Sequence, residues 1–89
     1  MTQIQVPIEH LAVTAQAFAR AAADAAALQA RLDQHMVGLA QEWHEANRQA
    51  FFGAYAQASA QLSQCAQLLT LISREMKSMA ERYESVDHG

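Results

Sequence analysis

The residues best suited to metal chemistry lie near the middle of the chain, in the run HEANR from His44 to Arg48. This run begins like the zinc motif HExxH, in which two histidines one helical turn apart hold the metal. Arg48 occupies the position of the second histidine, so a required ligand is missing. His10, His35 and His88 are scattered, and we interpret all four histidines as surface residues. The sequence therefore predicts no metal site and no cofactor.

Cys65 is the only cysteine, which excludes an internal disulfide. A free cysteine often packs as a small apolar residue, and we predict that role for Cys65; the alternative is a disulfide between two chains. Met36, Met76 and Met79 are interpreted as core residues. The chain contains no recognisable Ser-His-Asp arrangement, pair of catalytic carboxylates or glycine-rich phosphate loop. We therefore predict that the protein is not an enzyme.

The C-terminal run ERYESVDHG places Tyr83 and Asp87 four residues apart, on one side of a helix if the helix continues. Negative charge at Glu84 and Asp87 is unfavourable near a helix C-terminus. Ser85 and Val86 are poorer helix formers. We predict that the helix frays near residue 84 and leaves a short tail. The alternative interpretation of this segment is a solvated helix end without a role.

The composition favours long helices as the elements that position these residues. Apolar residues make up 52% of the 89 residues, with one proline and three glycines. Alanine, glutamine, leucine and glutamate are abundant, and all four are good helix formers. Large side chains are few, so the composition suits an elongated all-α protein that associates with another chain better than a globule.

Apolar residues recur at steps of three and four residues in each half of the chain. This spacing is typical of helices that pack along a seam. We predict a single domain over residues 1–89, with helix 1 at about 8–42, a turn at about 43–46 and helix 2 at about 47–84. The predicted hairpin or dimer seam consists of Leu11, Phe18, Leu32, Met36, Leu39, Phe51, Tyr55, Leu62, Cys65, Leu69, Ile72, Met76 and Met79.

The break between the helices is predicted from Trp43, which ends the first stripe, and Asn47, a suitable N-cap. The alternative is one continuous helix. Two long helices joined by a short turn fold back as an antiparallel hairpin. Further apolar residues, Phe52, Leu68 and Leu71, widen the stripe and predict that a second hairpin completes a four-helix bundle.

Several classes of function are disfavoured by charge and hydropathy. The net charge is −3 and no basic patch is present, so we predict no nucleic-acid binding. No apolar run reaches the length of a membrane span, so no membrane insertion is predicted. The N-terminal run MTQIQVPIEH does not have the pattern of a secretory signal peptide. This run indicates a cytoplasmic protein unless export uses another route.

One pattern combines the length of the chain, the tryptophan that ends helix 1, and a start that contains Val6, Pro7, Glu9 and Leu11. Ala46 and Phe51 follow Trp43 by three and eight residues, and Tyr83 and Asp87 complete a terminal Tyr-x-x-x-Asp. Together these features resemble the WXG family of small type VII secretion substrates, the early-secreted-antigen (ESAT-like) proteins. The resemblance covers nearly the whole chain.

The resemblance implies a helical hairpin that pairs into a homodimer or a heterodimer with a related protein. It also implies export through a membrane secretion machine, without a cleaved signal, after the secretion ATPase recognises the tail. By this resemblance, Tyr83 and Asp87 form the secretion signal and Trp43 shapes the turn. The chain departs from the family at Glu45, where the family has glycine. A glycine adopts left-handed backbone angles more readily than a glutamate, so the turn is expected to differ here.

Two rival interpretations give the tail no role. One is a cytoplasmic coiled-coil adaptor or chaperone-like helical bundle, which would share the seams. The other is a small helical bundle that binds a metal or another ligand. Detection of the protein only in the cytosol would favour the adaptor, and metal analysis of the purified protein would test the second.

Overall fold

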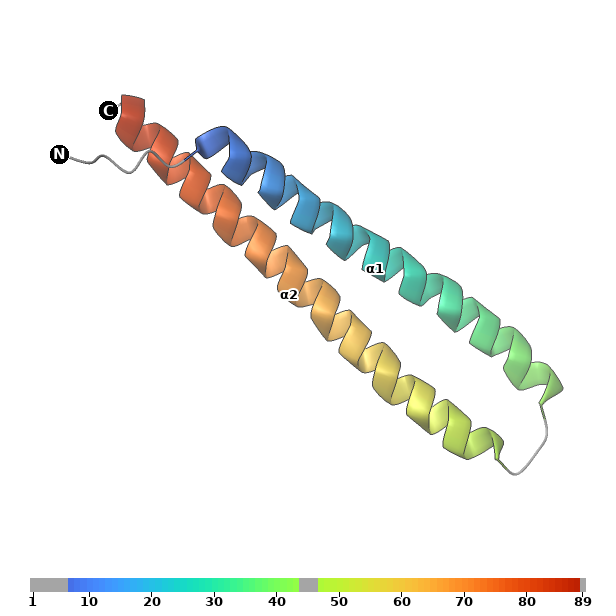
Figure 1. The fold of residues 1–89 in the computed structure, drawn as a ribbon. Helices are drawn as coiled ribbons and strands as arrows, with labels where there is room; N and C mark the ends of the chain where they lie inside the picture. The colour runs from blue at the N-terminus through green and yellow to red at the C-terminus, as the bar shows by residue number, and fades with distance from the viewer. Residues whose placement is uncertain (1–6, 44–46, 89) are drawn as a thin grey trace.

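Two long antiparallel helices make up the fold. The computed structural model describes residues 7–43 and 47–88. Helix α1 spans Ile8–Glu42 and helix α2 spans Arg48–His88. The helices run side by side, so that the start of α1 and the end of α2 lie at one end of the hairpin (Figure 1). The predicted all-α helical hairpin is confirmed, and the described residues contain no strand.

The ends of α1 are set by backbone geometry rather than by capping side chains. Pro7 precedes the helix with φ −74° and ψ 90°, and its carbonyl accepts a 2.9 Å hydrogen bond from the Leu11 N–H. At the other end, the Trp43 N–H donates to the Leu39 carbonyl, while Trp43 itself is extended at φ −98° and ψ 113°. No described residue has a positive φ. Within the described part of the chain, α1 therefore ends without the left-handed residue that a glycine would supply.

Helix α2 begins at Arg48, just before the aromatic pair Phe51 and Phe52. The carbonyl of Asn47 accepts a 3.1 Å hydrogen bond from the Phe51 N–H, which places Asn47 at the N-cap position. The predicted fraying near residue 84 is wrong, because α2 continues to His88. Serine, valine, aspartate and histidine each cost a helix only a few tenths of a kcal/mol relative to the best formers, roughly 0.7 at most. No glycine or proline lies between Gly53 and Gly89 to stop the helix.

The contact between the helices is thin and built from small side chains. Among the residues whose burial is described, Ala15, Ala22 and Ala80 are the buried apolar ones, and Ser73 is buried with them. No large side chain among the described residues is fully buried. Small side chains let the two helix backbones approach closely, but they remove little apolar area from water. The hairpin measures 69 × 19 × 16 Å and exposes 7180 Å² of surface.

The face of α2 that meets α1 differs from the predicted seam at three positions. Tyr55, Leu62, Leu69 and Met76 are half-buried in the hairpin, as the seam requires. Between them, however, the hairpin uses Phe52, Ala66 and Ser73 in place of Phe51, Cys65 and Ile72, each of which is one position earlier. Phe51, Cys65 and Ile72 are consequently exposed. The helix is rotated so that small residues, rather than the largest apolar ones, face α1.

Neither described helix contains a stretch that is both long and apolar enough to span a membrane.

Candidate functional site

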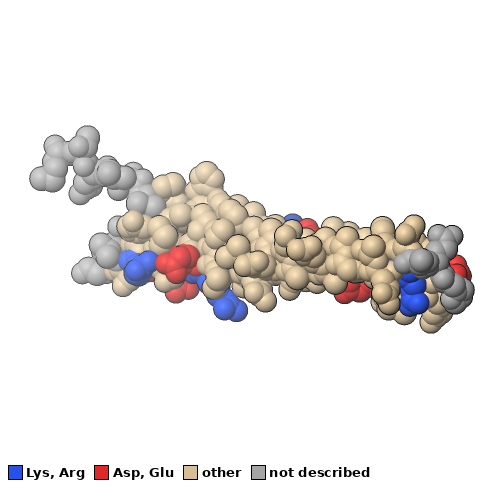
Figure 2. Space-filling view, turned by 90° about the horizontal axis from the view of Figure 1, so that it is seen from below, with Lys and Arg blue, Asp and Glu red and all other residues tan. Residues whose placement is uncertain are grey.

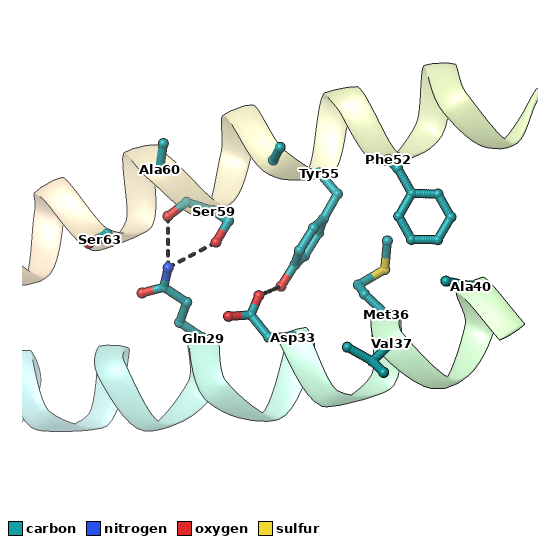
Figure 3. A pocket seen from close by; sticks show the side chains of 11 residues that line it. Gln29, Asp33, Met36, Val37, Ala40, Phe52, Tyr55, Ser59, Ala60 and Ser63 are labelled. Atoms are coloured by element: carbon teal, nitrogen blue, oxygen red, sulfur yellow. Dashed lines mark hydrogen bonds between the residues drawn. The ribbon is translucent and has the colours of Figure 1, made fainter.

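One side of the hairpin carries a groove that hydrogen bonds between the two helices cross. Its volume is about 670 Å³. Gln29 Nε2 donates hydrogen bonds to the carbonyl and to Oγ of Ser59, at 3.2 and 2.8 Å, and the Tyr55 hydroxyl donates to the Asp33 carboxylate (Figure 3). The groove is lined by Gln29, Asp33, Met36, Val37, Ala40, Phe52, Tyr55, Ala56, Ser59, Ala60 and Ser63. These hydrogen bonds join the two helices to each other and satisfy the polar groups within the hairpin.

The hydrogen bond to Asp33 changes the acidity of the Tyr55 phenol. The pKa of Tyr55 is raised above its ordinary value of 10.0, first because the neutral hydroxyl donates to Asp33. Partial burial and repulsion by the charge of Asp33 raise this pKa further. The neutral phenol is thus the form that fits the hairpin.

The same side of the hairpin continues toward the open end as a second groove. Its lining consists of Ala19, Ala22, Ala23, Ala26, Gln29, Ser63, Ala66, Gln67 and Thr70. Alanine, serine, threonine and glutamine offer little apolar area for a partner to bury. We call this whole side, defined by the residues that line the two grooves, the groove side.

Several large exposed apolar side chains lie on the opposite side, whereas Val37, which is 62% exposed, lines the first groove. Two residues along a helix correspond to a rotation of about 200°. Leu28 and Leu39 each follow a groove-lining residue of α1 by two positions, as Cys65 and Ile72 do in α2. They therefore point away from the grooves. We define the apolar face as Leu28, Leu32, Leu39, Phe51, Cys65, Leu68 and Ile72.

The apolar face is open to solvent along both helices. Its leucines in α1 are 39–42% exposed, Phe51 is 48% exposed, and Leu68 and Ile72 are 53% and 43% exposed. Cys65 is also exposed, where the sequence predicted a buried small residue. An apolar surface of this extent marks a site of protein association in a soluble protein.

Charged residues are unevenly distributed, because the middle of α1 carries Arg20, Asp24, Arg31 and Asp33 and the middle of α2 carries none. No charged residue occurs in α2 between Arg48 and Arg74. Figure 2 shows one long side of the molecule, on which Lys, Arg, Asp and Glu gather mainly near the two ends and leave the middle largely uncharged. The middle of α2 therefore has no charged residue that would oppose the approach of another apolar surface.

At the turn end, three aromatic rings pack together. The ring centroid of Trp43 lies 5.2 Å from that of Phe51 and 6.0 Å from that of Phe52, and the two phenylalanines are 6.1 Å apart. The Arg48 guanidinium lies 5.5 Å above the Phe52 ring. This cluster ties Trp43, the residue that follows α1, to the first turn of α2. Glu45, the other predicted turn residue, lies outside the described residues, as do its neighbours 44 and 46.

At the other end of the hairpin, Tyr83 is 40% exposed on α2. Because the helix continues to His88, the backbone positions of Tyr83 and Asp87 are one turn apart on the same helix face. The side chain of Asp87 lies outside the described part of the chain.

The predicted seam residues divide into two groups. Leu11, Phe18, Met36, Tyr55, Leu62, Leu69, Met76 and Met79 are half-buried in the hairpin, and Leu32, Leu39, Phe51, Cys65 and Ile72 are exposed on the apolar face. Sequence reasoning missed Ser59, Ser73 and Asp33, which bridge the helices. Ser59 and Ser73 share the heptad spacing of the seam, but a search for apolar stripes passes over serine. Among the described residues, no group of three or more possible metal ligands is found.

Comparison with known proteins gives a family match and similar solved structures. A family model described as proteins of 100 residues with WXG matches residues 3–88. The crystal structure of a secreted protein, EsxB from Bacillus anthracis strain Sterne, is similar with a TM-score of 0.85 and 28% identity, over 98% of this chain and 99% of that chain. A wild-type EsxB crystal structure from the same organism gives 0.82 and 27%, over 94% and 97%. No curated protein sequence matches the chain.

Proposed function

Because this chain belongs to the WXG100 family, the proteins of 100 residues with WXG, we propose that it is a non-catalytic protein exported by a type VII secretion system. It leaves the cell as a folded dimer, without a cleaved signal peptide. The match over residues 3–88 carries this proposal. The likeness of nearly the whole chain to EsxB, whose crystal structure is described as that of a secreted protein, supports it.

Pairing is the function of the apolar face in this proposal. The face presents large side chains from both helices to water, while the side chains that the hairpin buries within its described part are those of three alanines and one serine. A second hairpin laid on this face would cover these side chains and complete a four-helix bundle. The partner is a hairpin of the same family, either a copy of this chain or a related protein.

Recognition by the secretion ATPase is assigned to the end of α2. Tyr83 is exposed there, and the unbroken helix holds the positions of Tyr83 and Asp87 one turn apart. A helical presentation lets two side chains be read together without the entropy cost of ordering a frayed tail, about 1–2 kcal/mol for each backbone residue. Trp43 acts at the other end, where its contacts with Phe51 and Phe52 shape the turn.

The proposed role of the tail is tested by replacing Tyr83. Export of wild-type protein, Tyr83→Ala and the control Ser85→Ala is compared by measuring the protein in the culture medium and in the cells. Ser85 is exposed on the same helical segment but lies off the face shared by Tyr83 and Asp87.

We expect Tyr83→Ala to remain folded and dimeric, as checked by circular dichroism and light scattering, and to stay inside the cells. Ser85→Ala should be exported like the wild type. Accumulation of Tyr83→Ala in the medium at the wild-type level would show that the tail is not the signal.

A further inference from the structure

The lining of the first groove changes from polar to apolar along its length. At the end nearer the second groove, Gln29 is hydrogen-bonded to Ser59, and one turn further on Tyr55 is hydrogen-bonded to Asp33 (Figure 3). The side chains that line the groove between this second bond and the turn are all apolar: Met36, Val37, Ala40 and Phe52. The groove therefore has a polar end and an apolar end.

Asp33 is the only charged residue among those that line this groove. Helix α2 places no cation opposite it, because its sequence carries none between Arg48 and Arg74. Arg48 itself lies seven residues from Tyr55, about 10 Å along the helix axis, over the ring of Phe52. The facing helix therefore supplies no counter-charge at the polar end.

The Asp33 carboxylate keeps the capacity to bind a cation while it is bonded to Tyr55. A carboxylate has about four acceptor positions, and the Tyr55 hydroxyl donates to one oxygen, Oδ1. The ring of Tyr55 lies beside this carboxylate (Figure 3). Aromatic faces attract ammonium groups, so the carboxylate and the ring favour the same kind of ligand. A primary ammonium group, which has three donors, suits this end of the groove.

The groove also has the size of a small-molecule site. Its volume of about 670 Å³ falls within the roughly 300–1,000 Å³ of ligand pockets. From Asp33 to Ala40 the helix advances by seven residues, about 10 Å, a length comparable to that of an octyl chain. Val37 is 62% exposed in this stretch, so an alkyl chain laid along it would remove apolar surface of the protein from water.

We propose that the first groove binds a lipophilic primary amine, with the ammonium group at Asp33 and the alkyl chain along Met36, Val37 and Phe52. The order of polar and apolar lining fixes the direction of the ligand, and the charge of Asp33 selects an amine over an alcohol or a carboxylate. The site lies on the groove side, opposite the apolar face. This inference goes beyond the proposed function and does not depend on it.

The test compares three probes that share one alkyl chain and differ in the head group: octylammonium, octanol and octanoate. Each is titrated into isotope-labelled wild-type protein at a pH of about 7, where an alkylamine is protonated. Nuclear magnetic resonance gives a dissociation constant and locates the site from the shifted amide signals. We expect octylammonium to bind about fivefold or more tightly than octanol, and octanoate to bind most weakly. The largest shifts should fall on Ala40, Ala56 and Ala60, which line the groove.

Asp33→Asn removes the charge and keeps an oxygen that accepts a hydrogen bond from Tyr55. This variant should bind octanol like the wild type and should lose the preference for octylammonium. Asp24→Asn, on the same helix but outside the first groove, is the matched control and should keep that preference.

Equal affinities of the wild type for octylammonium and octanol would overturn the proposal. So would shifts confined to the apolar face, at Cys65 and Leu68, or a preference for octylammonium that survives in Asp33→Asn. The comparison of head groups is made on the wild type, so it is decisive even if Asp33→Asn alters the fold. Export is measured separately in the culture medium, so the amine site and the proposed function fail independently.

Discussion

The hydroxyl of Ser73 donates a 2.6 Å hydrogen bond across the hairpin to the backbone carbonyl of Ala15. Ser73 is 9% exposed and Ala15 is 3% exposed, so this bond lies where water is excluded. Because the acceptor belongs to the backbone, the bond fixes the position of α2 along α1. Fourteen residues further along α1, Gln29 bonds to Ser59, which lies fourteen residues back along α2. The two helices thus keep one register over two heptads.

Replacing Ser73 with alanine should destabilise the hairpin by about 0.5–1.5 kcal/mol, because a buried hydrogen bond is lost while packing volume is nearly kept. Thermal unfolding at a fixed protein concentration measures this as a lower midpoint. Ser78→Ala, at an exposed position of the same helix, is the control and should have little effect. Equal unfolding midpoints for Ser73→Ala and wild type would contradict the assigned role of the bond.

The hydrogen bond from Tyr55 to Asp33 should make stability depend on pH in the alkaline range. The pKa of Tyr55 is raised in the folded chain, so the stabilisation is present below the unfolded value of about 10 and is lost as pH rises through the folded pKa. Ionised Tyr55 has no proton to donate and repels Asp33.

Unfolding by denaturant at a series of pH values between about 8 and 11.5, around the unfolded pKa, compares wild type with Tyr55→Phe. The wild type should be the more stable protein below pH about 10, and its advantage should shrink above that pH. Other titrating groups are common to both proteins and cancel in the difference. A difference that stays constant across this range would show that the phenol and Asp33 are not coupled.

Gly53 occupies a helical position where an added methyl group would meet nothing within 4 Å. Replacing it with alanine should stabilise α2 by about 0.5–1 kcal/mol, because glycine loses more backbone freedom on folding. The unfolding midpoint should rise by about 2–8 °C for a domain of this size. A lower midpoint would mean that another chain packs against this position in the folded assembly.

Phe52 joins the turn cluster to both helices, through contacts with the ring of Trp43 and with Arg48. Phe52→Ala should destabilise the hairpin by about 1–3 kcal/mol, less than a fully buried phenylalanine would. Trp43 is the only tryptophan, so its fluorescence reports on this cluster directly. We expect its emission to shift to longer wavelength in Phe52→Ala and to remain unchanged in Gln57→Ala. The same emission in both variants would show that Phe52 does not pack on Trp43.

The helices and the hairpin could be predicted because their causes are local. The sequence itself shows apolar residues recurring at steps of three and four residues. It also shows the near absence of proline and glycine and the polar break after Trp43. The family was also predicted correctly, from the positions of Trp43, Phe51 and Tyr83 relative to one another.

The side of α2 that packs within the hairpin could not be predicted. Cys65 and Ala66 are neighbours, and either one fits a heptad that also contains Leu62 and Leu69. Hydropathy favours the stripe with the larger side chains, yet the hairpin buries Ser73 and half-buries Ser59 and Ala66. Cross-helix hydrogen bonds and close backbone approach decide this choice, and both depend on tertiary geometry. The stripe of larger side chains stays available to a partner. A search for a single seam per helix does not distinguish this stripe from the one that packs inside the hairpin.

The end of α2 was predicted to fray because its residues were judged one at a time. Ser85 and Val86 are weak helix formers, but extending an existing helix requires no new nucleation. The continuous helix makes Tyr83 and Asp87 a pair of positions on one face.

The measurement that tests the central claim most directly is the location of the wild-type protein in cells with a type VII secretion system. We predict that the protein accumulates in the medium when the secretion ATPase is active and is retained in the cells when the ATPase is inactivated. A cytosolic marker protein should stay in the cells in both cases. Finding the protein only in the cytosol while the ATPase is active would contradict the account and favour a cytoplasmic helical adaptor.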